Sequence, residues 1–140
     1  MPIEFTVLTW GALLGAIHIF LSVRQKIRQY GPEWSMGPRD ETLPPPTPVL
    51  GRLMRAQSNY FETFPIVVAG VLMLCVTGLT TRWTAIAALV WLVARVIYLP
   101  LYAAGVRSIR TFSFMISVVA IITLFWPLLA AGIDTSSLRQ

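Results

Sequence analysis

Four long apolar stretches constrain the fold of this chain more strongly than any other feature of its sequence. A helix needs about 20 predominantly apolar residues to cross the hydrocarbon core of a bilayer. Only 12% of the 140 residues are charged, against roughly 25% in soluble domains. We therefore predict an all-α membrane protein, a single domain over residues 1–140, in which four transmembrane helices form a bundle with antiparallel neighbours. The predicted spans are residues 6–23, 59–79, 83–104 and 112–133.

The first connection, residues 24–54, is rich in proline and charged residues. We expect the first helix to end near Val23, because the basic residues from Arg24 onward mark the membrane interface. The prolines of this loop exclude a long helix, and the helical pattern resumes at about Val49. Later prolines lie inside predicted helices and should kink them, namely Pro65, Pro100 and Pro127.

Positive charge lies mostly on one side of this topology. The first and third connections hold most of the basic residues, whereas the other side has only Arg82 and Arg139. By the positive-inside rule the basic connections are cytoplasmic and both termini are outside. The net charge of +5 therefore reflects topology, and we expect no nucleic-acid partner. The first apolar run follows no basic segment, so we expect a retained helix and not a signal peptide.

A group of polar side chains lies at the start of the second predicted membrane helix. Arg55, Asn59 and Glu62 fall at i, i+4 and i+7, which places them on one helical face. Glu62 is the only carboxylate that we expect at membrane depth, where an unpaired charge is costly and indicates a functional site. A guanidinium, an amide and a carboxylate together suit a small zwitterionic ligand.

A second polar group lies near the end of the third span, where Arg95, Tyr98 and Tyr102 share a face. The topology brings this group and the first one to the same side of the membrane, so all six residues can converge. An alternative is that Glu62 and Arg95 form a buried ion pair while the others anchor the membrane interface. A buried ion pair seldom stabilises more than apolar packing, so the joint pattern favours a site.

Other reactive side chains carry weaker signals. His18 has no second ligand at metal spacing, so we expect a core role and no metal site. Cys75 is the only cysteine and cannot form an internal disulfide. Ser108 and Thr111 have no histidine and carboxylate arranged for a hydrolase triad.

Two motifs connect these residues to a known family. The segment Arg55-Ala56-Gln57-x-Asn59-x-x-Glu62-x-Phe64-Pro65 resembles the second-helix signature of the membrane-associated proteins in eicosanoid and glutathione metabolism, the MAPEG family. The segment Ala94-Arg95-Val96-x-Tyr98-x-x-x-Tyr102, with the basic turn to Arg110, resembles their third-helix signature. The long proline-rich first loop differs from the short connections of the best-known eicosanoid members, so the resemblance does not imply an eicosanoid substrate. The chain looks more like one of the family's bacterial branches, which implies a bacterial inner membrane.

The resemblance implies a homotrimer that holds glutathione, its co-substrate, in a cytoplasm-facing pocket between subunits. Arg55 would bind a glutathione carboxylate, while Asn59 and Glu62 would hold the γ-glutamyl end. Two bidentate guanidinium groups would suit the two carboxylates of the tripeptide. The remaining wall of the pocket would be formed by Arg95, Tyr98 and Tyr102.

The resemblance also implies a membrane-bound transferase or peroxidase that activates the glutathione thiol against lipophilic electrophiles from the bilayer. Arg110 would face the thiol and favour its thiolate, although Arg107 and Arg24 remain candidates for this role. Two alternatives are a non-catalytic family member that binds an amphipathic ligand, and a solute carrier. A carrier usually shows paired repeats, which this sequence lacks. The electrophile and the identity of the thiol stay open.

Overall fold

The computed structural model describes residues 1–133, except for the side chains of Arg107 and Ile109, and Arg139 lies outside the described residues. All regular structure in this part of the chain is helical. Four helices are long and apolar enough to cross a membrane, which confirms the predicted all-α membrane fold. The helices are α1 (Ile3–Tyr30), α2 (Pro32–Met36), α3 (Pro48–Thr77), α4 (Arg82–Ala104) and α5 (Arg107–Ile133).

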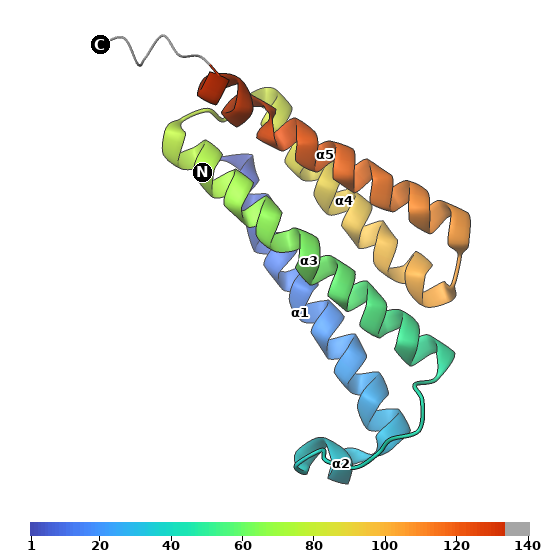
Figure 1. Cartoon of the computed structure of the whole chain (residues 1–140). Coiled ribbons are helices and arrows are strands. Elements are labelled where there is room, and N and C mark those ends of the chain that lie inside the picture. The colour runs from blue at the N-terminus through green and yellow to red at the C-terminus, as the bar shows by residue number, and fades with distance from the viewer. Residues whose placement is uncertain (134–140) are drawn as a thin grey trace.

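The four long helices lie side by side, with α1 next to α3 and α4 next to α5 (Figure 1). Helix α3 also packs against α4 and α5, so it joins the two pairs into one bundle. The short helix α2 and the turn between α4 and α5 lie at the same end (Figure 1). Residues from the start of α3, the end of α4 and the start of α5 therefore meet at this end.

The expected end of the first helix was wrong. We placed it near Val23, but α1 continues to Tyr30 and ends at Gly31, whose φ is 89°. The basic residues after Val23 change the polarity of the surface, but they are good helix formers and do not interrupt the backbone pattern. The helix stops only where Gly31 adopts a conformation that L side chains rarely adopt, directly before Pro32.

The connection between α2 and α3 is fixed to the end of α1 by hydrogen bonds. Gln29 accepts from the backbone N–H of Thr47 (2.9 Å) and donates to the Pro45 carbonyl (2.9 Å). The Tyr30 hydroxyl donates to the Pro44 carbonyl (3.0 Å). Thr47 then caps α3, because its hydroxyl accepts from the N–H of Leu50 (3.4 Å). The proline-rich segment is thus an ordered connection that lies against the end of α1 and leads into α3.

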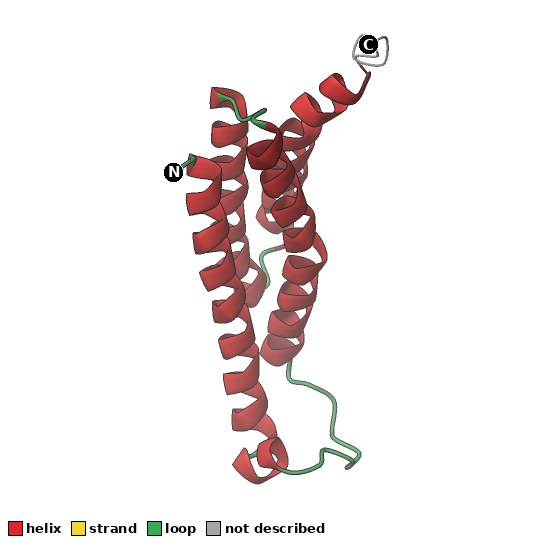
Figure 2. Cartoon of the chain, turned by 90° about the vertical axis from the view of Figure 1, so that its left-hand side faces the viewer, coloured by secondary structure: helices red, strands yellow, loops and turns green. Residues whose placement is uncertain are grey.

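The two central prolines, Pro65 and Pro100, lie inside helices that continue through them. The last turns of α5, which contain Pro127, bend away from the other helices (Figure 2). A neighbouring helix or side chain can re-satisfy the carbonyl that a proline leaves without its backbone partner. The kinks expected at Pro65 and Pro100 stay predictions.

Helices α1 and α3 approach closely through two glycines. A Cβ on Gly11 would stand 2.7 Å from the Phe64 ring, and one on Gly15 would stand 3.3 Å from the Tyr60 ring. The Tyr60 hydroxyl donates to the Gly11 carbonyl (2.6 Å). Small residues spaced one turn apart let the backbone of one membrane helix come close to the side chains of another. This contact sets the position of α3 relative to α1.

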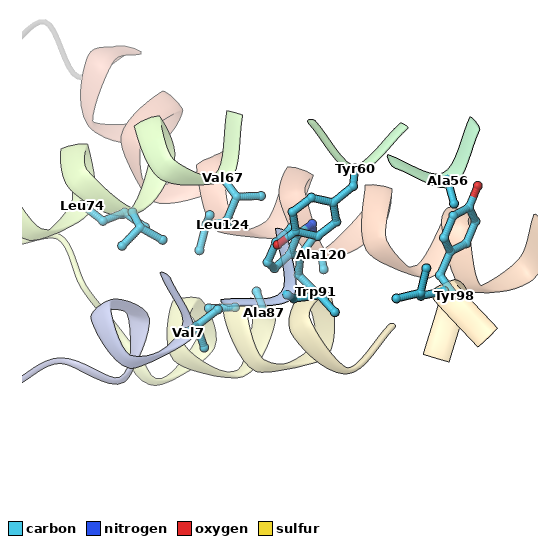
Figure 3. Packing of buried hydrophobic residues seen from close by; sticks show 14 of the residues in the cluster. Val7, Ala56, Tyr60, Val67, Leu74, Ala87, Trp91, Tyr98, Ala120 and Leu124 are labelled. Carbon is cyan, nitrogen blue, oxygen red and sulfur yellow. The ribbon is translucent and has the colours of Figure 1, made fainter. Parts of the chain in front are cut away.

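The core of the bundle is an aromatic and aliphatic cluster around Tyr60 and Trp91 (Figure 3). The His18 ring stacks on Tyr60 at a centroid distance of 4.5 Å, and its Nδ1 lies 2.9 Å from the Leu14 carbonyl oxygen. His18 is therefore a core residue, as expected. No group of potential metal ligands gathers anywhere in residues 1–133.

A carboxylate that the sequence did not single out is buried at the opposite end of the bundle. Glu4 is 2% exposed and accepts a hydrogen bond from the Thr84 hydroxyl (2.7 Å). The sequence analysis did not predict a buried carboxylate in this part of α1. Glu4 lies only three residues from the start of the chain, so hydropathy placed it outside the first span, but α1 begins at Ile3 and carries it inward.

Candidate functional site

Four of the predicted site residues line one pocket at the end of the bundle where α2 lies. The pocket has a volume of about 210 Å³. Helix α3 contributes Asn59, α4 contributes two tyrosines, and α5 contributes a guanidinium and an aromatic ring. The lining residues are Asn59, Tyr98, Tyr102, Arg110, Thr111 and Phe114. Three consecutive long helices thus build the site.

Arg95 lies behind the wall of this pocket and is 1% exposed. Its Nη1 donates to Oδ1 of Asn59 (2.8 Å) and its Nη2 donates to the Thr63 hydroxyl (2.9 Å). The guanidinium also lies 5.4 Å from the Tyr98 ring centroid and 5.3 Å from that of Phe114, within the range of cation–π attraction. Arg95 therefore holds α3, α4 and α5 together with one planar group.

The hydrogen bond from Arg95 also determines what Asn59 offers to a ligand. Because the Asn59 carbonyl oxygen accepts from the guanidinium, the amide NH₂ remains as its donor side. An NH₂ donor suits a carboxylate. The pocket wall that Asn59 forms is therefore a donor surface.

Two cations lie against a pair of tyrosines whose rings are in tilted contact. The Arg110 guanidinium lies 4.8 Å from the Tyr102 ring centroid, and the Tyr102 centroid lies 5.3 Å from that of Tyr98. The Arg95 guanidinium lies 5.4 Å from the Tyr98 ring centroid. The arrangement gives the pocket two positive charges, and no carboxylate stands among its lining residues. A site of this kind favours an anionic ligand.

The proposed ion pair between Glu62 and Arg95 does not form within residues 1–133. Glu62 is exposed on α3 and accepts a hydrogen bond from the Ser58 hydroxyl (2.9 Å). Arg95 contacts neutral oxygens of Asn59 and Thr63 in place of a carboxylate. The simple alternative to a functional site, a buried structural ion pair between these two residues, was therefore wrong.

Two predicted residues lie outside the pocket of the single chain. Arg55 and Glu62 are both exposed on α3, and the Arg55 guanidinium folds back toward Gly51, 3.3 Å from the position of a Cβ there. Arg24 is also exposed, on α1. The side chain of Arg107, the other candidate for the thiol, is outside the described residues.

The sequence analysis did not single out Thr63, which bonds Arg95, or Phe114, which lines the pocket. Thr63 stands one helical turn after Asn59 and accepts the second hydrogen bond of Arg95. Its hydroxyl also donates within α3, to the Asn59 carbonyl (3.1 Å). The only signal was a hydroxyl at i+4 from Asn59 on the same face, and such a residue in a membrane helix is usually bonded to its own backbone.

The fold and the pocket define a polytopic α-helical membrane protein with a cationic site at one end of its bundle. The MAPEG family model matches residues 7–130, and the chain belongs to this family. No curated protein matches the chain. Membership of the family supports a glutathione-related membrane function in general, such as that of a transferase or peroxidase.

Proposed function

We propose that this protein is a membrane-bound glutathione transferase or peroxidase that acts on lipophilic electrophiles. The observation that carries the proposal is the pocket in which Arg110 and Arg95 flank the tyrosine pair beside the Asn59 amide. Glutathione has two carboxylates and one ammonium. Guanidinium and NH₂ donors are the groups that bind carboxylates with the best geometry.

The site is proposed to be completed by a second copy of the chain in a homotrimer. The pocket of about 210 Å³ is smaller than the roughly 300–1,000 Å³ of most small-molecule sites. It also lacks an anion for the ammonium, whereas Glu62 and Arg55 are exposed on α3. Exposed charges at this depth need a partner, and a site shared between subunits would supply one.

The chemistry proposed for the site is thiol activation by Arg110. A free thiol has a pKa near ~8.5 and is mostly protonated at neutral pH. A guanidinium close to the sulfur favours the thiolate, and each unit by which the pKa falls corresponds to about 1.4 kcal/mol. The thiol proton leaves to water. The thiolate then forms a bond to the electrophilic carbon, and the leaving group takes the electron pair of the bond that breaks.

The direction of the site is part of the proposal. The pocket lies at the end of the bundle that also carries Arg24, Lys26 and Arg28 of α1, and the positive-inside rule makes this end cytoplasmic. Glutathione would then enter from the cytoplasm of a bacterial cell, while the electrophile would enter between helices from the lipid. An orientation-specific label on the outer Arg82 side tests this topology.

The experiment that tests the function uses the purified, detergent-solubilised protein. Glutathione is titrated by calorimetry, and conjugation of a generic aromatic electrophile is measured on the same preparation. Saturable binding with turnover above the uncatalysed rate is expected. Binding without turnover would instead support a non-catalytic family member, and no binding would contradict the proposal. A second titration with a different low-molecular-weight thiol shows which thiol is used.

A further inference from the structure

Arg52 connects the start of α3 to the turn between α4 and α5. Its Nε donates to the Pro48 carbonyl (3.1 Å), which holds the side chain along α3. The guanidinium lies directly against Gly105, because a Cβ on Gly105 would overlap Nη1 and would stand 3.3 Å from Cζ. This contact joins two segments that are more than 50 residues apart in the chain.

Gly105 occupies the position at which the backbone leaves α4. It has a φ of 79°, and its N–H donates to carbonyls of the last turn of the helix. Glycine is favoured here for two reasons, because an L side chain is strained at this φ and because a Cβ would displace Arg52. A guanidinium at the carboxyl end of a helix is also favourable, since that end carries partial negative charge.

The turn links two residues of the pocket. Tyr102 precedes it on α4 and Arg110 follows it on α5, and the guanidinium of Arg110 lies 4.8 Å from the Tyr102 ring centroid. Asn59 stands two helical turns after Arg52 on the same face of α3. Helix α3 therefore contacts the α4–α5 pair at the turn through Arg52 as well as at the pocket through Asn59.

We propose that Arg52 is a positioning residue for the site. It holds the turn against α3 and thereby sets the position of Arg110 relative to Asn59, although it does not line the pocket itself. This inference rests on the proposed function of Arg110. A shift of about 1 Å in a group that acts on the reacting atom can slow a reaction by up to roughly 10²-fold, so the turn must be held in place.

Two substitutions break the contact from opposite sides. Arg52→Ala removes the guanidinium, and Gly105→Ala displaces it with a Cβ. Each should slow conjugation at saturating glutathione by roughly 10- to 100-fold while the Kd for glutathione changes only a few fold. The double variant should be no slower than the slower single variant, because both remove the same contact. Arg28→Ala, an exposed arginine of α1, is the matched control.

Amide hydrogen exchange tests the contact without any activity. Arg52→Ala should speed exchange at Gly105 and Val106, because a turn that is no longer held opens more often. Exchange at Leu79, in the turn at the other end of α4, should not change. If the parent protein neither binds nor conjugates glutathione, the proposed function fails. Amide exchange then still tests whether Arg52 holds the turn between α4 and α5. Unchanged exchange at Gly105 and Val106 in the Arg52→Ala protein overturns the positioning role, whether or not conjugation slows.

Discussion

Arg95 on α4 donates a 2.8 Å hydrogen bond from Nη1 to Oδ1 of Asn59 on α3. This bond ties a buried cation to a residue of the pocket wall and turns the Asn59 amide so that its NH₂ remains as a donor. The other terminal nitrogen of the guanidinium, Nη2, donates a second hydrogen bond to the Thr63 hydroxyl (2.9 Å). The same arginine thus contributes to stability and prepares the site for an anion.

The Arg95–Asn59 bond leads to a prediction about stability. Asn59→Ala leaves Nη1 of a buried guanidinium without its acceptor, which should lower the free energy of unfolding by about 1–3 kcal/mol. Ser58→Ala is the neighbouring control, because the hydroxyl of Ser58 bonds to the exposed Glu62. Denaturant unfolding in detergent checks the difference. Equal stabilities of the two variants would show that the bond contributes nothing.

The α1–α3 contact gives a second stability prediction. Gly11→Ala places a Cβ 2.7 Å from the Phe64 ring, and such overpacking costs about 1–3 kcal/mol. Gly132→Ala is the matched control, because nothing lies within 4 Å of its added Cβ. Gly11 lies in the interior of α1, where alanine raises the intrinsic helix propensity, so a lower melting temperature of Gly11→Ala than of the control reports the cost of overpacking. A Gly11→Ala protein as stable as the control would contradict the close approach.

Glu62 should bind the ammonium group of glutathione from its exposed position on α3. Glu62→Gln should therefore weaken glutathione binding by about 2–5 kcal/mol, the cost of removing one member of a desolvated charge pair. The fold should be unaffected, since the side chain is exposed and its hydrogen bond comes from the exposed Ser58 hydroxyl. Calorimetric titration measures the change, with Glu33→Gln of α2 as the control. Unchanged affinity in folded Glu62→Gln protein removes Glu62 from the site.

The proposed assembly is a homotrimer with three equivalent sites. Arg55 and Glu62 are exposed on α3, a helix long and apolar enough to span a membrane, and a neighbouring subunit would give these charges a partner surface. Native mass spectrometry in mild detergent should show trimers, and calorimetry should show one glutathione for each subunit. Spectra with monomers or dimers alone would count against a shared site.

Arg110 should act on turnover more than on binding. Arg110→Ala should leave the Kd for glutathione within a few fold but lower the conjugation rate by ~10²-fold, because an interaction with developing charge appears in kcat. Arg107→Ala and Arg24→Ala identify the acting residue if it is not Arg110, and Arg82→Ala, at the start of α4, is the charge-matched control. Full activity in the Arg110→Ala, Arg107→Ala and Arg24→Ala variants would exclude activation by any of these arginines.

Much of the fold could be predicted because lipid leaves few choices. A chain with four apolar runs of sufficient length must form four helices, and the i, i+3 and i, i+4 spacings then place Arg95, Tyr98 and Tyr102 on one face. The end of α1 was predicted wrongly, because hydropathy reports where the membrane ends and Gly31 decides where the helix ends. The end of a membrane span and the end of a helix are therefore set by different physical causes.

The partners of the site residues were harder to predict than the residues themselves. A charge-based argument pairs Arg95 with Glu62, yet the structure pairs it with Asn59 and Thr63. Spacing determines which face a side chain occupies but not how the faces of α3 and α4 are rotated toward each other. Arg52 belongs to the first connection of the sequence analysis, whose basic residues served only to assign topology. Its contact with Gly105 could not be predicted, since that contact depends on how α3 meets the turn.

The central claim is that the pocket holds glutathione as a thiolate, and ultraviolet absorbance tests this most directly. Thiolates absorb where thiols do not, so the parent protein titrated with glutathione at neutral pH should gain a saturable thiolate band. The band should weaken in Arg110→Ala and return only at higher pH, because without the guanidinium the thiol pKa reverts toward ~8.5. A parent protein that binds glutathione without any thiolate band up to that pH would contradict the account.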